Sequence, residues 1–429
     1  MGQELLNRGV IPHGTIWGAT ALLNKKYHNL LVNILVSSDG KISKISRNKI
    51  NVKARKSIDC QKKKVTLGWM DFNANFCDPG FEYKEDLNSA TNLSAKSGFT
   101  DVLISPDTNP VIQSKNDIAY IKNKSKNDFC TIHASASITK NSEGKQMNDF
   151  IDLHREGALA FSDNKIENSE LILNTLIYLK QFDGLYISRP QEKYLSTGLV
   201  NDGINSNILG LKSIPNISET IAIERDLSLV EYSGGKIHFS GISTKESVEL
   251  IRSAKKKGLK VTCDVPIYNL LFDDSKILDF DTNYKVYPPL RSKDDIKELF
   301  NGLNDGTIDV ISSFHQPQDI DSKNCEFDKA SFGIISIQTF YSNILEISRH
   351  ISEDILIEKF TKNPRKILGL EIPKIEEGSF SLLTVLDEEG SWDYNETTNL
   401  SKSSNSPWMD WSLKGKVSGV VFGSKTNIN

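Results

Sequence analysis

The sequence predicts an α/β fold, namely a TIM-type (β/α)8 barrel with a small β-sandwich domain built from both termini. Short β-rich apolar runs alternate with helical patterns from about residue 65 onward, whereas the two ends carry only short strands and turns. Alternation on this scale favours a parallel sheet with right-handed crossovers. A chain of 429 residues also has room for one large barrel and one small accessory domain.

The predicted barrel strands are the runs that combine β-branched or aromatic residues with flanking turn signals. Between them, segments such as 219–232 and 245–257 carry apolar residues at the three- and four-residue spacing of a helix. The eight predicted strands are 65–72, 99–104, 129–134, 158–162, 184–188, 236–240, 259–265 and 307–312.

The two ends of the chain predict a second, smaller unit. Strands are expected at 30–36 and 41–46, joined by the turn Ser38-Asp39-Gly40, and again at 381–386 and 415–422. Residues 391–407 form a polar stretch that predicts a loop. The predicted domains are therefore residues 1–57 (first part of the β-sandwich), 58–371 (barrel) and 372–429 (second part of the β-sandwich).

Composition argues against several classes of partner. A net charge of −3 and a pI near 6.2 give no general attraction to nucleic acid or to anionic membranes. The lysine runs at 62–64 and 255–257 are expected to be solvated. No apolar run approaches ~18 residues, and Met1–Leu6 lack the pattern of a signal peptide. We therefore expect a soluble cytoplasmic protein that binds neither nucleic acid nor membrane.

The five cysteines are expected to be reduced and mostly buried. They are scattered and odd in number, and none forms a Cys-x-x-Cys pair, which argues against a disulfide framework and a structural zinc site. They are Cys60, Cys77, Cys130, Cys263 and Cys325.

Several separate motifs resemble those of one enzyme family. Ser-Pro-Asp-Thr-Asn-Pro at 105–110 is similar to Met-Pro-Asn-Thr-x-Pro, Gly-Ala-Leu-Ala-Phe-Ser-Asp at 157–163 to Gly-Ala-x-Ala-Phe-Ser-Asp, and Lys-Val-Tyr-Pro-Pro-Leu-Arg at 285–291 to Lys-x-Asn-Pro-Pro-Leu-Arg. In this order they resemble the dihydroorotases of the long bacterial type, in the amidohydrolase superfamily. Further matching segments are 67–85, 97–100, 242–247, 305–311 and 364–370.

The resemblance implies a zinc-binding strand at 67–85, but the ligand residues differ. The family pattern Gly-x-x-Asp-x-His-x-His-x-Arg-(Asp/Glu)-Pro-Gly has Asn73 and Asn75 in place of its histidines. Histidines two apart on a strand share a face and can reach one Zn²⁺, whereas an asparagine amide is a poor ligand for this ion. Cys77 stands in place of the arginine that binds the substrate carboxylate, and it has no charge to offer.

Other positions implied by the resemblance have changed as well. Ser188 and Gly241 stand at the ends of the fifth and sixth strands, where the family has histidines, and Phe314 stands in place of the aspartate that acts as general base. Asp107 and Tyr287 replace two asparagines that contact the substrate. An aspartate at 107 is expected to repel a carboxylate ligand.

Two family residues remain, the aspartate Asp163, which would bridge the metals, and His315. A binuclear site needs roughly four to six protein ligands, so these two do not suffice. We expect structural roles for both, with Asp163 as a cap and His315 packed at a strand end. No metal and no cofactor are expected.

The leading hypothesis is a non-catalytic dihydroorotase homologue of pyrimidine biosynthesis. The resemblance implies a structural or regulatory partnership with aspartate transcarbamoylase and a homodimer. The first alternative is an active dihydroorotase or other cyclic amidohydrolase with a modified site, using zinc or recruiting His315, Asp163, Cys77 and Lys84, for instance through a nucleophilic Cys77/His315 pair. The second alternative is a sensor that binds a cyclic amide or a nucleotide precursor without turnover.

Overall fold

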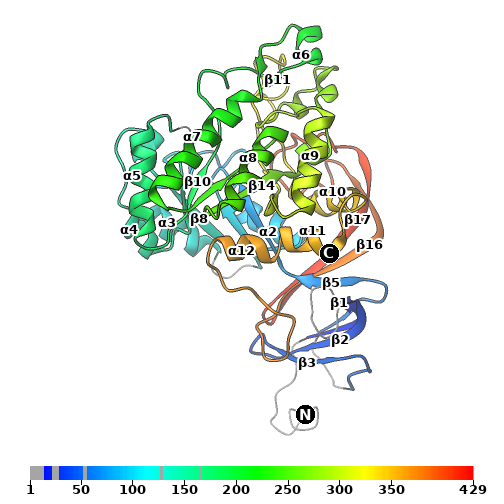
Figure 1. Ribbon diagram of the computed structural model, residues 1–429. Helices are drawn as coiled ribbons and strands as arrows, with labels where there is room; N and C mark the ends of the chain where they lie inside the picture. Colours follow the sequence, from blue (N-terminus) through cyan, green and yellow to red (C-terminus); the bar gives the residue numbers. More distant parts are fainter. Residues whose placement is uncertain (1–13, 22–28, 52–55, 126–128, 165, 429) are drawn as a thin grey trace.

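The computed structural model describes residues 14–21, 29–51, 56–125, 129–164 and 166–428. The expectation for Met1–Leu6 lies outside these ranges. In the described part of the chain, eight parallel strands follow one another around a barrel, and helices cover its outside (Figure 1). The strands are β6 (Trp69–Ala74), β7 (Phe99–Ile104), β8 (Thr131–Ser137), β9 (Ala160–Ser162), β10 (Tyr186–Ser188), β13 (Ile237–Phe239), β14 (Val261–Pro266) and β15 (Val310–Ser312).

The barrel is nearly closed between its first and last strands. A parallel bridge joins Ala74 to His315, and the backbone N–H of Asn75 donates to the carbonyl of His315 at 2.8 Å. The backbone N–H of Ser313 donates to the carboxylate of Asp71 at 2.9 Å. The predicted barrel is confirmed, and its β6–β15 seam lies directly beside several of the predicted site residues.

The helices form the outer layer, and short turns and an insertion surround the strand ends. Thr244 begins α8 by accepting a hydrogen bond from the backbone N–H of Ser247, as expected of a threonine N-cap. The helices are α2 (Leu87–Lys96), α3 (Lys115–Ser125), α4 (Phe150–Glu156), α5 (Ser169–Lys180), α6 (Ile204–Leu209), α7 (Ile217–Ser233), α8 (Lys245–Lys256), α9 (Lys293–Asn304), α10 (Phe340–Ile347), α11 (Glu353–Lys359) and α12 (Lys362–Ile367). The insertion between β10 and α7 also contains a small ladder of β11 (Val200–Asn201) and β12 (Ser213–Ile214). Elsewhere, the described residues form the 3-10 turns η1 (Lys140–Ser142), η2 (Ile267–Leu270), η3 (Asp274–Ile277) and η4 (Thr282–Tyr284).

Strands from both ends of the chain form a second, mostly antiparallel sheet with its own small apolar core, as the sequence predicts. Figure 1 shows β1, β2, β3 and β5 together at one end of the molecule. The order is β18 (Lys425–Ile428), β17 (Trp411–Phe422), β16 (Leu382–Tyr394), β5 (Lys64–Leu67), β1 (Gly14–Ala21), β2 (Leu30–Val36) and β3 (Ile42–Ser46), and β4 (Lys56–Asp59) pairs with β1.

Two predicted elements differ from the structure. The run 65–72 is not one strand, because the chain changes sheets at Gly68: β5 pairs with β16, and β6 pairs with β7. A Cβ at position 68 would lie 2.4 Å from the side chain of Thr100, so the crossing point requires glycine. The predicted loop at 391–407 begins as strand, since residues 391–394 of β16 pair with β17 after a register shift.

No helix in the described ranges is both long enough and apolar enough to cross a lipid bilayer.

Candidate functional site at the barrel mouth

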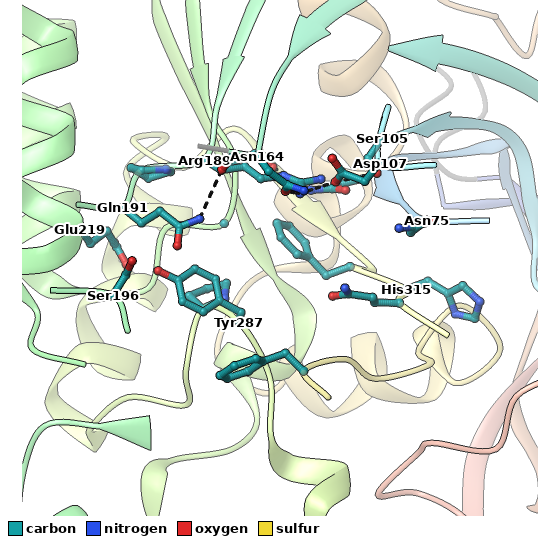
Figure 2. Close-up of a pocket in the computed structure, with 18 of the residues that line it drawn as sticks. Asn75, Ser105, Asp107, Asn164, Arg189, Gln191, Ser196, Glu219, Tyr287 and His315 are labelled. Atoms are coloured by element: carbon teal, nitrogen blue, oxygen red, sulfur yellow. Dashed lines mark hydrogen bonds and ion pairs between the residues drawn. The ribbon is translucent and has the colours of Figure 1, made fainter. Parts of the chain in front are cut away.

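A cavity of about 320 Å³, lined by both polar and apolar side chains, lies at the carboxyl ends of the barrel strands. Figure 2 shows Arg189, Asn164, Asp107 and Ser105 gathered on one side of it, and Gln191, Ser196, Glu219 and Tyr287 on another. Seven of the predicted site residues line this cavity: Asn73, Asn75, Asp107, Gly241, Tyr287, Phe314 and His315. Ser188, Asp163 and Cys77 do not line it.

The alternation of side chains along β10 explains the position of Ser188. Ile187 belongs to the apolar cluster inside the barrel, so the residue two positions later, Arg189, faces the same side and reaches the cavity. Ser188 faces outward, and its hydroxyl donates to the carboxylate of Asp226 on α7 at 2.7 Å. The residue that the fifth strand presents to the mouth is therefore Arg189.

The two asparagines of β6 are held by hydrogen bonds to their neighbours. The amide of Asn73 donates to Ser240 at 2.9 Å, and the amide oxygen of Asn75 accepts from the backbone N–H of Cys77 at 2.8 Å. Cys77 itself has a left-handed backbone (φ 61°) and is buried. Burial raises the pKa of its thiol to about 12, so this cysteine is not an activated nucleophile.

Phe314 fills space next to Gly241. A Cβ at position 241 would lie 2.9 Å from Cζ of Phe314, and the Phe314 ring also makes an edge contact with Tyr268 at 6.4 Å between centroids. Phe314 thus occupies part of the mouth. A side chain that can neither bind a cation nor accept a proton therefore occupies this wall.

Asp107 is paired with an arginine of this same chain. Its carboxylate accepts from Nη1 of Arg189 at 2.5 Å and from the hydroxyl of Ser105 at 3.2 Å, and Nη1 of Arg189 also donates to Asn164. The repulsion expected between Asp107 and a carboxylate ligand is therefore offset by the guanidinium beside it.

Asp163 caps the loop after β8, consistent with the structural role expected of it. Its carboxylate accepts from the hydroxyl of Ser137 at 2.8 Å and from the backbone N–H groups of Ile138 and Thr139 at 2.9 and 3.1 Å. Burial raises its pKa, although these hydrogen bonds act in the opposite direction.

His315 is buried as a neutral imidazole. Its Nδ1 accepts from the backbone N–H of Ser336 at 3.2 Å, which places the proton on Nε2, and burial lowers the pKa to about 3. Nε2 lies 4.0 Å from the carboxylate of Glu85 and has no hydrogen-bond partner among the described residues. No hydrogen bond joins His315 to Cys77 in the described part of the chain. Lys84, the other group that could be recruited, donates to Gln318 at 2.8 Å.

Another wall of the cavity contains a second pair of opposite charges, and both members of this pair are buried. Glu219 accepts from the backbone N–H of Ser243 at 2.8 Å and lies 3.8 Å from Nη2 of Arg291, whose Nη1 donates to Asn201 at 2.9 Å. With Arg189 and Asp107, the cavity has two positive and two negative side chains. The charges that line the pocket are therefore balanced.

The donor set does not fit the metal centre that the family pattern implies. Among the described residues no group of three or more histidine, cysteine, aspartate or glutamate side chains could hold a metal ion. The hydrogen bonds of Asn73, Asn75 and Asp163 also show that these side chains are committed to protein partners.

Sequence reasoning missed Arg189, Asn164, Gln191 and Ser196, which line the cavity. Arg189 directly follows the predicted strand 184–188, so counting two residues on from Ile187 would have indicated it. Asn164, Gln191 and Ser196 lie in loops, where no periodic signal exists.

Solved structures with the same fold are hydantoinases. L-hydantoinase (dihydropyrimidinase) from Arthrobacter aurescens matches with a TM-score of 0.85 at 19% identity, covering 97% of this chain and 96% of that one. A D-hydantoinase from a Thermus species matches with a TM-score of 0.81 at 18% identity, covering 97% and 95%. These matches establish the fold alone, a (β/α)8 barrel with a second sheet.

Sequence comparisons give the family. Residues 63–247 match the dihydro-orotase-like family model. Proteins named dihydroorotase from Trichlorobacter lovleyi (35% identical, covering 91% of this chain and 93% of theirs) and Aquifex aeolicus (37%, 90% and 92%) are similar over nearly the whole length. The chain belongs to the dihydroorotase family.

Proposed function

We propose that this protein is a non-catalytic dihydroorotase homologue that serves pyrimidine synthesis as a structural or regulatory partner of aspartate transcarbamoylase. The main support for a loss of catalysis is the position of Phe314. It stands where the family pattern has the general base, and its ring lies against Gly241. A histidine cannot be added at position 241 without moving the Phe314 ring.

The remaining polar groups do not rebuild a catalytic site. A Cys77/His315 pair would need a thiolate and an imidazole that is free to accept the proton of the thiol. The burial of Cys77 and the raised pKa of its thiol argue against the first requirement. The lowered pKa of His315, together with its hydrogen bond from Ser336, argues against the second.

The test of catalysis combines two measurements on the purified full-length protein. We expect less than stoichiometric zinc by elemental analysis and no turnover of dihydroorotate when zinc is supplied. A zinc-loaded, active protein would contradict the proposal and support the alternative, an active cyclic amidohydrolase with a modified site. An active dihydroorotase of the family, assayed in parallel, is the positive control.

The test of partnership uses size-exclusion chromatography. The protein is mixed with the aspartate transcarbamoylase and the active dihydroorotase of its own organism at micromolar concentrations. Co-elution with the transcarbamoylase is expected. A free homodimer that does not associate with either protein would remove the scaffold role.

The pocket also favours a second candidate function. A cavity of about 320 Å³ with both polar and apolar walls is large enough for a small molecule. A sensor that binds a cyclic amide or nucleotide precursor without turnover is therefore the alternative if partnership fails.

A further inference from the structure

A second, smaller cavity lies inside the barrel next to the mouth. Its volume is about 10 Å³, the size that holds one water molecule or one monatomic ion. It shares Asn73, Ser105, Arg189 and Ser240 with the large pocket, and the apolar side chains of Phe72 and Ile187 form its floor. It is therefore an inner extension of the mouth.

Two buried serines line this cavity without a partner. Ser135 on β8 and Ser162 on β9 are 2% and 3% exposed. Neither hydroxyl has a hydrogen-bond partner among the residues that the structure describes. Both hydroxyls open into the cavity, so each can donate to a water molecule or an ion placed there.

Arg189 and Asn73 add further donors. A guanidinium has five N–H groups, and only Nη1 of Arg189 is used, by Asp107 and Asn164, within the described ranges. Nε and Nη2 keep three N–H groups. Asn73 uses one amide hydrogen on Ser240 and keeps the other.

Carboxylates do not line the small cavity among the described residues. The carboxylate of Asp264 lies behind Ser240 and accepts from Ser240, Ser312 and the backbone N–H of Gly241. Ser240 and Ser105 donate to carboxylates, so the donors left for a guest are those of Ser135, Ser162, Arg189 and Asn73. This set suits an anion and not a cation.

We infer that the small cavity is a binding site for a chloride-sized monovalent anion, held by Arg189, Asn73 and the hydroxyls of Ser135 and Ser162. The charge preference of the barrel mouth is then the reverse of that of a metal centre. The inference does not depend on partnership with aspartate transcarbamoylase, and halide binding is measured separately from zinc content and turnover.

Crystals of the full-length protein grown or soaked in sodium bromide test the site directly. An anomalous bromine peak is expected within hydrogen-bond distance of Ser135, Ser162 and Arg189. Bromide sites only on the outer surface, or a water in the cavity at high bromide, would overturn the inference.

Thermal unfolding provides the solution test. At equal ionic strength, sodium chloride should raise Tm by about 2 °C over sodium gluconate, because a ligand that binds only the folded state stabilises it. Arg189→Gln should abolish this difference, and Ser162→Ala, a smaller change that keeps the charge, should reduce it by at least half. The matched control is Lys260→Gln, an exposed lysine at the opposite end of the barrel, which should keep the full difference.

The same experiment separates a monatomic anion from the acidic group of a larger molecule. Stabilisation by sodium formate without stabilisation by chloride would overturn the inference and assign the cavity to a ligand carboxylate. Equal Tm values in chloride and gluconate for the unmodified protein would also overturn it.

Discussion

The ring of Phe314 occupies the space that a side chain at Gly241 would need. A Cβ on Gly241 would lie 2.9 Å from Cζ and 3.0 Å from Cε1 of Phe314, closer than ordinary van der Waals contact. Gly241 also has φ of +78°, where only glycine is free of strain. The two positions, which in the family pattern carry a histidine and an aspartate, therefore depend on one another.

Replacing Gly241 by alanine should destabilise the protein by roughly 2–4 kcal/mol, because backbone strain and overpacking add. Gly258→Ala is the matched control: its φ is +81° but no atom lies within 4 Å of its Cβ, so only about 1 kcal/mol of strain is expected. Urea unfolding of both variants measures the difference. Equal losses would show that Phe314 does not restrict position 241.

The double variant Gly241→Ala/Phe314→Ala isolates the contact. Its loss of stability should be smaller than the sum of the two single losses by about 1 kcal/mol, because removing the ring opens room for the new methyl group. Additive losses would contradict a direct clash.

The sequence predicted the parts of this fold that depend on local pattern. The strand at 99–104 matches β7, and Phe314 lies at the mouth as its place in the motif indicates. The sequence could not predict the Arg189–Asp107 ion pair, because these residues are 82 positions apart and meet only when the barrel forms. Nor could the sequence show that Cys77 has a left-handed backbone and does not line the pocket.

Asp71 should make stability depend on pH. Burial raises its pKa to about 7, despite hydrogen bonds from Ser313 that lower it, against about 3.9 in the unfolded chain. The folded state then binds more protons than the unfolded state between pH 4 and 7, so the free energy of unfolding falls as pH rises through this window.

Asp71→Asn should remove this dependence. An asparagine can still accept from the N–H of Ser313, and the variant should be more stable than the unmodified protein by roughly 1–3 kcal/mol at pH 8 and about equal at pH 4. Urea unfolding at the two pH values measures this, with the exposed Asp321→Asn as control. An unchanged pH slope would show that Asp71 is ionised throughout.

Arg365 on α12 stabilises the end of the barrel opposite the mouth. Its buried guanidinium donates to the carbonyls of Gly68 and Thr361, both at 2.8 Å, and to the carboxylate of Asp101. Although burial alone would raise it, the pKa of Asp101 is held below its usual value by Arg365 and His133. This contribution to stability is present above about pH 4 and is lost as pH falls below it.

Arg365→Met should therefore cost roughly 3–5 kcal/mol at pH 7, because it leaves Asp101 as a buried charge with one partner fewer. The penalty should shrink at pH 3, where Asp101 can take up a proton. Lys366→Met, at the exposed neighbouring position, should cost less than about 0.5 kcal/mol. A penalty for Arg365→Met that is independent of pH would indicate lost packing only.

Restoring the family residues one at a time should not restore hydrolysis, because ligands and base act as a unit. Asn73→His alone gains one ligand, Phe314→Asp alone places a carboxylate without a metal, and Gly241→His meets the ring of Phe314. Ser188→His points toward Asp226 on α7, since that is the side the serine faces. Each single variant should show no zinc-dependent turnover of dihydroorotate.

Only the combined variant restores all of the family residues at once, although its histidine at position 188 still faces Asp226. The seven changes are Asn73→His, Asn75→His, Cys77→Arg, Asp107→Asn, Ser188→His, Gly241→His and Phe314→Asp. Even here the left-handed backbone at positions 77 and 241 has to accommodate large side chains, and Arg189 remains in the mouth where its charge repels zinc. Adding Arg189→Ala should therefore increase zinc retention by at least tenfold over the seven-site variant, measured by elemental analysis after dialysis. Measurable turnover in the unmodified protein or in any single variant would contradict the non-catalytic assignment. Equal zinc retention with and without Arg189 would show that the charge of Arg189 does not govern cation binding at the mouth.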